Sequence, residues 1–317
     1  MASRKTMLAA AVAAVCAMPV SPAFADGEKI VAAFHNLAEP FFVFMQRELT
    51  DEAKKQNVSV SVLDGQASSP KQTSDVENAL VQGVDGIILA PTDVKALVPA
   101  VNEAIEEKIP LVTVDRRVEG ADKPVAHVGA DNVAGGRKMA EWVMKNHPNG
   151  ARIVLLTGQP GSSSGIDRAK GVHDAFAKAG DKYKIVAEQT ANWERAQGLT
   201  VSENILTSLT GNPPDVIVAL NDDMALGAIE AIHSSGLSGK GIKVLGFDAV
   251  PEALKQIKAG QMAATVEQSP SVQIRTALKS LVDNIRNRAE LKSTAIEPVL
   301  ITAENLQKAE RIAEVKD

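Results

Sequence analysis

The sequence predicts an α/β fold built from two similar lobes, each with a doubly wound parallel sheet. Strand-like and helix-like segments alternate along the chain, and this rhythm restarts after residue 146; such alternation is typical of parallel sheets covered by helices. Two apolar runs, 111–114 and 243–247, lead into Asp115 and Asp248. Because ligands of open α/β sheets sit outside the carboxyl ends of the strands, these aspartates suggest two lobes facing one ligand. The alternative is that each aspartate only caps the turn after its strand.

The N-terminus predicts a secretory signal peptide over residues 1–25. Arg4 and Lys5 precede an apolar run over 7–20, and the small-x-small pattern Ala23-Phe24-Ala25 follows. The run is shorter than the ~20 residues that span a bilayer. We expect cleavage after Ala25 and a mature chain in the periplasm.

The first lobe is expected to take up the chain from residue 26 to 130. Its strands and helices alternate, with apolar runs of strand length and amphipathic runs of helix length. The predicted strands are 29–34, 58–64, 86–90, 111–114 and 126–129, and the predicted helices are 41–56, 70–82 and 94–107.

The second lobe repeats the pattern. A helix over 132–146 opens it, and the segments 84–93 and 213–222 are alike: each is a buried strand, a polar turn and the start of a helix. The predicted strands are 152–157, 183–189, 215–220 and 242–248, and the predicted helices are 164–179, 194–210 and 224–235.

The tail predicts a return to the first lobe. A strand over 263–268 is followed by a helix over 271–287 and a strand over 298–302. We therefore expect an N-terminal lobe of 26–130 plus 269–297 and a C-terminal lobe of 131–268 plus 298–317. No low-complexity linker separates them, which suits a hinge rather than a flexible tether.

Composition excludes several classes of protein. Cys16 is the only cysteine and lies in the predicted signal peptide, so disulfides and a thiol nucleophile are excluded from the mature chain. The formal net charge is −5, and loss of Arg4 and Lys5 makes it more negative, which disfavours nucleic acid. None of the five histidines has metal-ligand spacing, so no metal or cofactor is predicted.

Aromatic residues gather where strands are predicted to end. Flat apolar rings at the mouth of a cleft can stack on the C–H faces of a sugar or cyclitol. For Phe44 we favour ordinary helix packing, and for Phe42 and Trp193 we favour the site, because polar turn residues surround them. The set is Phe41, Phe42, Phe44, Trp193 and Phe247.

Charged and amide side chains complete the predicted site. Carboxylates accept hydrogen bonds and guanidinium groups donate them, so together they can saturate vicinal hydroxyls. The near balance of signs indicates a neutral polyol, although each arginine could instead form a surface or inter-lobe ion pair. The set is Asp115, Arg116, Arg168, Asn221, Asp248 and Gln268, and His35, at the end of the first strand, is expected to line the same cleft.

The glycine-rich turn over 158–165 invites two other interpretations. It lacks the lysine of a nucleotide-binding loop. Gly161-x-Ser163-x-Gly165 matches a hydrolase nucleophile elbow, but three residues separate it from the preceding strand, where an elbow follows directly. We interpret it as a tight turn that lets backbone N–H groups and Arg168 approach the cleft.

Over essentially the whole mature chain, the sequence resembles the ribose-binding-protein-like family of periplasmic solute-binding proteins. The resemblance implies a type I fold with a three-segment hinge. It also implies that the protein delivers a sugar to an ATP-driven (ABC) importer. By position, it also implies first-lobe stacking by Phe41 and Phe42, opposite stacking by Trp193, and hydrogen bonding by the polar set. Its marks are Glu39-Pro40-Phe41-Phe42, Ala90-Pro91-Thr92-Asp93, Val114-Asp115-Arg116, Gly129-Ala130-Asp131-Asn132, Leu220-Asn221-Asp222-Asp223-Met224-Ala225-Leu226-Gly227 and Gly246-Phe247-Asp248.

Departures from the ribose pattern indicate another ligand. Ribose binders carry small or amide side chains where this sequence has His35, Glu39 and Ala90. Glu39 adds an acceptor that suits a ligand with more hydroxyls. Segments 124–137, 162–173 and 266–278 look closer to the myo-inositol-binding branch of the family.

The sequence therefore predicts a non-enzymatic binding protein that closes over myo-inositol by hinge motion and docks on an inner-membrane permease. Ribose, another monosaccharide or an alditol is the alternative ligand. A sugar-responsive transcription regulator would need a basic N-terminal DNA-binding module, and a secreted hydrolase would rest on the weak serine motif. A monomer is the simplest expectation.

Overall fold

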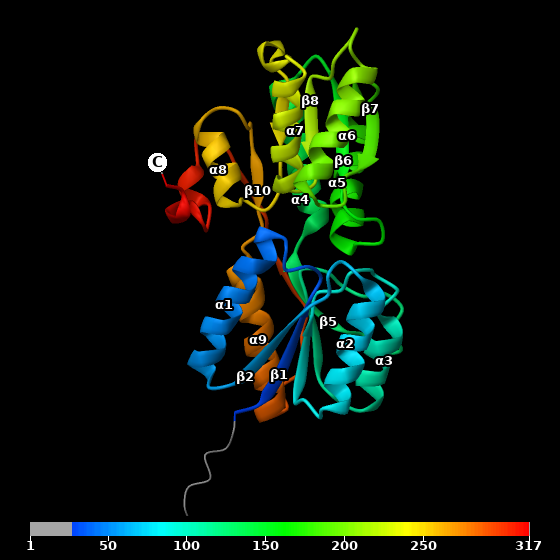
Figure 1. Cartoon of the computed structure of the whole chain (residues 1–317), viewed down its shortest axis with the longest axis vertical. Coiled ribbons are helices and arrows are strands. Elements are labelled where there is room, and N and C mark those ends of the chain that lie inside the picture. Colours follow the sequence, from blue (N-terminus) through cyan, green and yellow to red (C-terminus); the bar gives the residue numbers. More distant parts are fainter. Residues whose placement is uncertain (1–26, 317) are drawn as a thin grey trace, which may run out of the picture.

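The computed structural model describes residues 27–316, and the predicted signal peptide lies outside them. Two α/β lobes are stacked along the long axis (Figure 1). The lower lobe combines the N-terminal part of the chain, blue to cyan, with an orange segment from near its C-terminal end. This arrangement confirms the predicted two-lobed α/β fold.

The first lobe contains a six-stranded parallel sheet in the order β11-β5-β4-β3-β1-β2. Side chains alternate along β1: Ile30, Ala32 and Phe34 join one core cluster, and Val31 and Ala33 join the other. This period of two is what a strand buried on both faces requires. The strands are β1 (Lys29–Phe34), β2 (Ser59–Asp64), β3 (Gly86–Leu89), β4 (Leu111–Val114), β5 (Ala126–Ala130) and β11 (Thr294–Ile296).

Helices cover both faces of this sheet. α1 (Pro40–Gln56) and α9 (Pro270–Asn287) pack together on one face, and α2 (Ser69–Val81) and α3 (Val98–Glu106) cover the other (Figure 1). α3 begins later than predicted because the Asp93 side chain accepts hydrogen bonds from the N–H groups of residues 95 and 96 and holds a separate turn.

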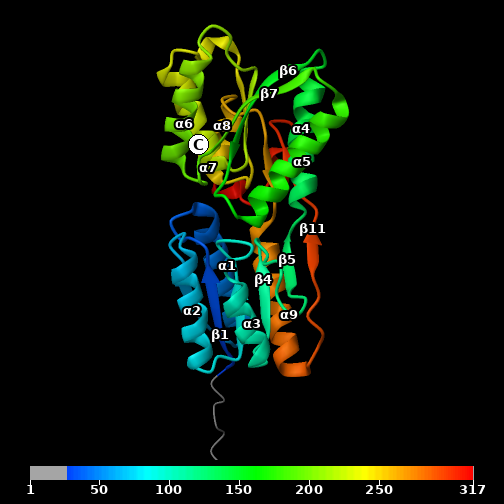
Figure 2. The same cartoon turned by 90° about the vertical axis from the view of Figure 1, so that its right-hand side faces the viewer.

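The second lobe has a four-stranded parallel sheet in the order β7-β6-β8-β9. Helices α4 and α5 pack together, as do α6 and α7, and Figure 2 shows the two pairs on opposite sides of the lobe. The elements are β6 (Ala151–Thr157), β7 (Tyr183–Thr190), β8 (Val216–Ala219), β9 (Lys243–Leu245), α4 (Asn132–Asn146), α5 (Ser163–Ala179), α6 (Arg195–Ser208), α7 (Asp222–Ser234) and α8 (Pro251–Lys258).

An antiparallel pair, β10 (Thr265–Glu267) and β12 (Val299–Ile301), extends this lobe beside β9. The chain passes between the lobes three times: between β5 and α4, between β10 and α9, and between β11 and β12. The residue boundaries given above for the lobes remain a prediction.

The last residues form short 3₁₀ turns, Leu306–Lys308 and Ile312–Glu314, that the sequence did not predict. They lie against α1, where Arg47 donates to Glu314 at 2.6 Å. The Phe44 ring lies between the guanidinium groups of Arg47 and Arg311, at 4.6 and 4.3 Å. Phe44 therefore packs on the helix face, as expected.

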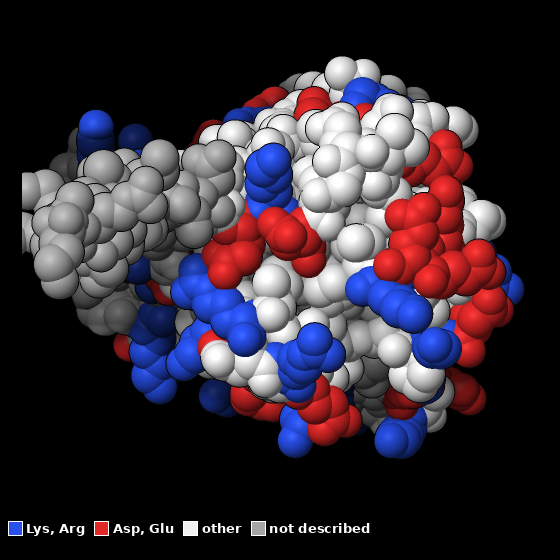
Figure 3. Space-filling model, turned by 90° about the horizontal axis from the view of Figure 1, so that it is seen from below, with Lys and Arg blue, Asp and Glu red and all other residues white. Residues whose placement is uncertain are grey.

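The surface at the base of the first lobe carries both signs of charge, with acidic side chains gathered along one edge and no continuous basic face (Figure 3). Within residues 27–316, no helix is long and apolar enough to cross a membrane. The same part of the chain contains no cluster of His, Cys, Asp or Glu that could hold a metal ion.

Candidate functional site

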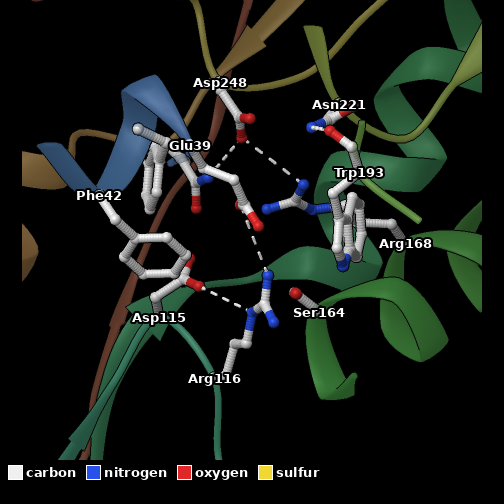
Figure 4. Close-up of a pocket in the computed structure, with 11 residues that line it drawn as sticks. Glu39, Phe42, Asp115, Arg116, Ser164, Arg168, Trp193, Asn221 and Asp248 are labelled. Carbon is white, nitrogen blue, oxygen red and sulfur yellow. Dashed lines mark hydrogen bonds and ion pairs between the residues drawn. The ribbon is translucent and has the colours of Figure 1, made fainter. Parts of the chain in front are cut away.

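A cavity of about 230 Å³ lies between the two lobes, where the parallel strands of both sheets end (Figure 4). Its lining residues are Glu39, Phe41, Phe42, Asp115, Arg116, Ser164, Arg168, Trp193, Asn221, Asp248 and Gln268.

The first lobe contributes two adjacent segments. Asp115 and Arg116 directly follow β4, and their side chains lie 3.5 Å apart. Glu39 is the N-cap of α1, so Phe41 and Phe42 fall in the first turn of that helix after Pro40. Proline favours the first turn of a helix, so Pro40 fixes where α1 starts and where the two rings lie.

The second lobe holds Arg168 in place through its own backbone and side chains. Arg168 Nε donates to Asn132 Oδ1 at 2.8 Å, and Nη1 donates to the carbonyl oxygen of Leu220 at 2.7 Å. Its guanidinium stacks 3.6 Å from the Phe247 ring centroid and lies 3.5 Å from Asp248. The arginine can therefore present its remaining donors to the cavity without moving.

Gln268, Asp248 and Asn221 are also paired. Gln268 Nε2 donates to Asp248 Oδ1 at 2.6 Å. Asn221 is the N-cap of α7: its Oδ1 accepts from the N–H of Met224 at 2.9 Å, and its Nδ2 donates to the Trp193 carbonyl oxygen at 3.0 Å. Asn221 thus links the start of α7 to the turn that carries the tryptophan.

Aromatic rings from both lobes wall the cavity. Phe41 and Phe42 meet edge to face, with centroids 5.2 Å apart. The Arg116 guanidinium lies 5.4 Å from the Phe42 ring and 5.5 Å from the Trp193 ring. A Cβ at position 158 would stand 1.9 Å from the indole of Trp193, so a glycine there leaves room for the ring.

Several buried polar atoms around the cavity have no hydrogen-bond partner in the described part of the chain. They include Asp115 Oδ1, Arg116 Nη1 and Trp193 Nε1, on residues that are 4%, 3% and 2% exposed. Arg116 Nε also has no hydrogen bond, although it lies 3.5 Å from Asp115 Oδ2. A buried polar atom without a partner costs about 1–3 kcal/mol. One acceptor and two donors beside aromatic walls fit a polyhydroxylated guest.

The backbone is strained at the same place. Asp115, Trp193 and Asp248 have φ angles of 60°, 72° and 111°, in a region that side chains rarely adopt. Such residues cluster at ligand sites because the surrounding structure must compensate for the strain. The turn at Asp248 also explains why β9 ends at Leu245 rather than at the predicted residue 248.

Burial shifts the acid–base properties of the site. Burial raises the pKa of Asp115 and of Asp248, although the nearby Arg116 and Arg168 guanidinium groups oppose the shift. Burial also raises the pKa of Glu39 to about 7, against the opposing effect of Arg116. His35 is neutral because burial and Arg116 lower its pKa to about 2.

Residues 30–289 match the model of the periplasmic binding protein domain family. The chain belongs to this family. The match covers most of the sequence and confirms the predicted family, the periplasmic binding proteins.

Individual relatives agree with the family assignment. The ribose import binding protein RbsB of Bacillus subtilis (strain 168) is 39% identical over 264 residues, which cover 83% of each protein. The crystal structure of a Caulobacter myo-inositol binding protein bound to myo-inositol is 56% identical, with a TM-score of 0.89, covering 90% of this chain and 97% of that one. A Bacillus halodurans C-125 solute binding protein with bound myo-inositol is 31% identical, with a TM-score of 0.83 and coverage of 89% and 97%.

Ten of the twelve predicted site residues of this periplasmic binding protein line the cavity, and two lie behind it. The Phe247 ring stacks on the guanidinium group of Arg168. His35 is buried, with Nδ1 3.2 Å from Thr92 Oγ1 and Nε2 3.2 Å from Glu39. Both residues therefore act on the cavity through a neighbour.

Sequence reasoning missed Ser164, which lines the cavity at the start of α5. Its hydroxyl lies 3.0 Å from that of Ser162, so the serine-rich turn was the available signal. Ser163, the serine of the elbow-like motif, instead accepts a hydrogen bond from the N–H of Arg117.

Asp115 and Asp248 could instead have capped the turns after their strands, but a different aspartate bonds in this way to a nearby turn. Asp222, at the start of α7, accepts from the N–H of Val250 at 2.9 Å and from the Thr265 hydroxyl at 2.7 Å. Asp115 Oδ1 has no partner within residues 27–316, and Asp248 pairs with side chains. Asp115 and Asp248 are therefore oriented toward the cavity rather than toward their own turns.

Proposed function

We propose that this periplasmic binding protein binds one molecule of a neutral cyclitol, myo-inositol, by closing its two lobes over it, and that the twelve predicted residues form or support that site. The observation that carries the proposal is the group of unpartnered buried donors and acceptors in a cavity walled by rings from both lobes. A ligand that contacts both lobes stabilises the closed form, because those contacts exist only there.

Two relatives support the choice of ligand, since both were solved with myo-inositol. Ribose, another monosaccharide or an alditol is the second candidate, favoured by the ribose import relatives. The carboxyl group of Glu39 at the cavity wall favours myo-inositol, because it adds a hydrogen-bonding group for a ligand with more hydroxyls than a pentose.

We propose further that the chain has no catalytic activity, acts as a monomer, and passes its ligand to an inner-membrane permease. The relatives named above are binding proteins, which supports the first point. Cleavage of the signal peptide after Ala25 would release the mature chain into the periplasm. A sugar-responsive regulator and a hydrolase have no support from the site.

A thermal-shift screen of the mature protein against inositols, pentoses, hexoses and alditols tests the ligand. A ligand that binds the folded state raises the midpoint by mass action. We expect the largest shift with myo-inositol, and calorimetry should then give one site per chain with unaltered ligand recovered. A shift with ribose and none with myo-inositol would reverse the choice.

A further inference from the structure

The hydrogen-bond network behind the cavity fixes where protons lie. Gln72 Nε2 donates to the carbonyl oxygens of Ala33 and Ala90, at 3.2 and 2.8 Å, so the orientation of its amide is set. Its Oε1 then accepts from both the N–H and the hydroxyl of Thr92, at 2.8 and 3.0 Å. The single hydroxyl proton of Thr92 is therefore already used.

This leaves one arrangement for His35. Because Thr92 Oγ1 can only accept at this contact, the proton of the neutral imidazole must lie on Nδ1, 3.2 Å away. The other nitrogen, Nε2, then carries a lone pair and faces Glu39 Oε1 at 3.2 Å. A hydrogen bond across that gap needs its proton on the glutamate.

We propose that Glu39 acts in the closed, liganded protein as a neutral carboxylic acid, which donates to His35 Nε2 and leaves Oε2 to face the ligand and Arg116, so that ligand binding takes up a proton. This inference rests on the proposed function. Asp115 and Asp248 lie 3.5 Å from the guanidinium groups of Arg116 and Arg168, so the acidic and basic groups of the cavity face one another, and the cavity is matched to an uncharged guest rather than to an amine or a phosphate.

The groups that face Glu39 support the assignment. Its side chain is 13% exposed, and the nearest cation, Arg116 Nη2, is 3.8 Å away, beyond hydrogen-bond distance. Burial, with repulsion from Glu194, outweighs the attraction of two arginines and a hydrogen bond from the Asn36 side chain, and raises the pKa of the group to about 7. The charged and titratable groups around it are His35, Arg116, Arg168, Glu194 and Asp223.

The sign of the pH effect follows from the two states. In the open protein water reaches Glu39, and its pKa lies nearer the ordinary value of ~4.3. The raised pKa of the closed state favours binding at low pH, and this contribution is lost as the pH rises through about 7. The affinity for a neutral ligand should therefore fall about twentyfold between pH 5.5 and 7.5.

Calorimetry with myo-inositol tests the inference on the mature protein, in paired buffers that differ in their heat of ionisation. We expect uptake of about one proton per ligand at pH 6 and almost none at pH 8. Glu39→Gln, whose amide can donate to His35 at every pH, should bind without proton uptake and with a flat pH profile. Thr92→Val frees the imidazole to place its proton on Nε2, so it should reduce the uptake.

Glu290→Gln is the matched control, because Glu290 is 80% exposed, lies outside the cavity lining and loses the same charge; it should keep the parent profile. Binding of myo-inositol without proton uptake, or uptake that persists in Glu39→Gln, would overturn the inference while leaving the proposed function intact. Complete absence of myo-inositol binding would overturn both.

Discussion

The two lobes differ in how far the protein itself supplies hydrogen-bond partners for the polar groups of the site. In the second lobe, Arg168 is held by Asn132 and the Leu220 carbonyl, and Asp248 accepts from Gln268. In the first lobe, Asp115 Oδ1 and Arg116 Nη1 have no hydrogen-bond partner in the described chain. Apart from the Trp193 Nε1 donor, the second-lobe half is therefore preorganised, whereas the first-lobe half is completed by what the cavity holds.

This difference predicts which substitutions lower the stability of the free protein and which lower mainly its affinity for the ligand. A change on the preorganised side should damage the protein with or without ligand, because it removes contacts that are already made. A change on the other side should mainly reduce affinity, because the contacts it removes form only with the ligand.

The largest expected effect is that of Arg168→Ala. It removes two buried hydrogen bonds and leaves the buried Asp248 without its cation, so we expect ligand affinity to fall by about 2–5 kcal/mol. The unfolding midpoint of the free protein should fall as well. Arg137→Ala is the control, since that arginine is 53% exposed on α4. Parent-like affinity of Arg168→Ala in calorimetry would show that the site is misplaced.

Asp115→Asn should have a smaller effect, confined to binding. Asparagine tolerates the positive φ of residue 115, so the backbone can stay as it is. It removes the unpartnered carboxylate, and we expect an affinity loss of about 1–3 kcal/mol with a smaller midpoint shift than Arg168→Ala gives. Equal destabilisation of the two free variants would break the comparison between the lobes.

Trp193→Phe should have the smallest effect of the three. The ring remains, but the unpartnered Nε1 donor and part of the stacking area are lost, which should reduce affinity by about 0.5–1.5 kcal/mol. Trp142→Phe, on α4 and outside the cavity lining, is the matched control and should bind like the parent in the same titration.

The pH dependence of binding also tests the difference between the lobes, because Glu39 belongs to the first lobe. Its protonation on closure would make the first lobe the source of the pH effect. Asp248 also has a raised pKa, but it contacts Arg168 and Gln268 in the same lobe. A pH profile that survives in Glu39→Gln would move the effect to the second lobe.

Much of the fold was predictable because periodicity and strand-end polarity are local signals. The strand over residues 29–34 and the positions of Asp115 and Asp248 followed directly from the sequence. What could not be predicted depends on geometry between distant segments. Whether His35 lines the cavity or supports Glu39 is decided by Thr92 and Gln72, and Ser164 reaches the cavity only because α5 starts where it does.

The placement of α9 has a consequence for the order in which the molecule can be completed. Its apolar face, with Ile274, Leu278 and Leu281, closes the same core cluster as β1 and α1, yet it is encoded after almost the whole second lobe. A chain that grows from its N-terminus therefore lacks this cover over the first sheet until synthesis is nearly finished. The first lobe to be translated is thus not the first to be finished, and a late truncation before Pro270 would leave the oldest part of the chain with its apolar surface uncovered.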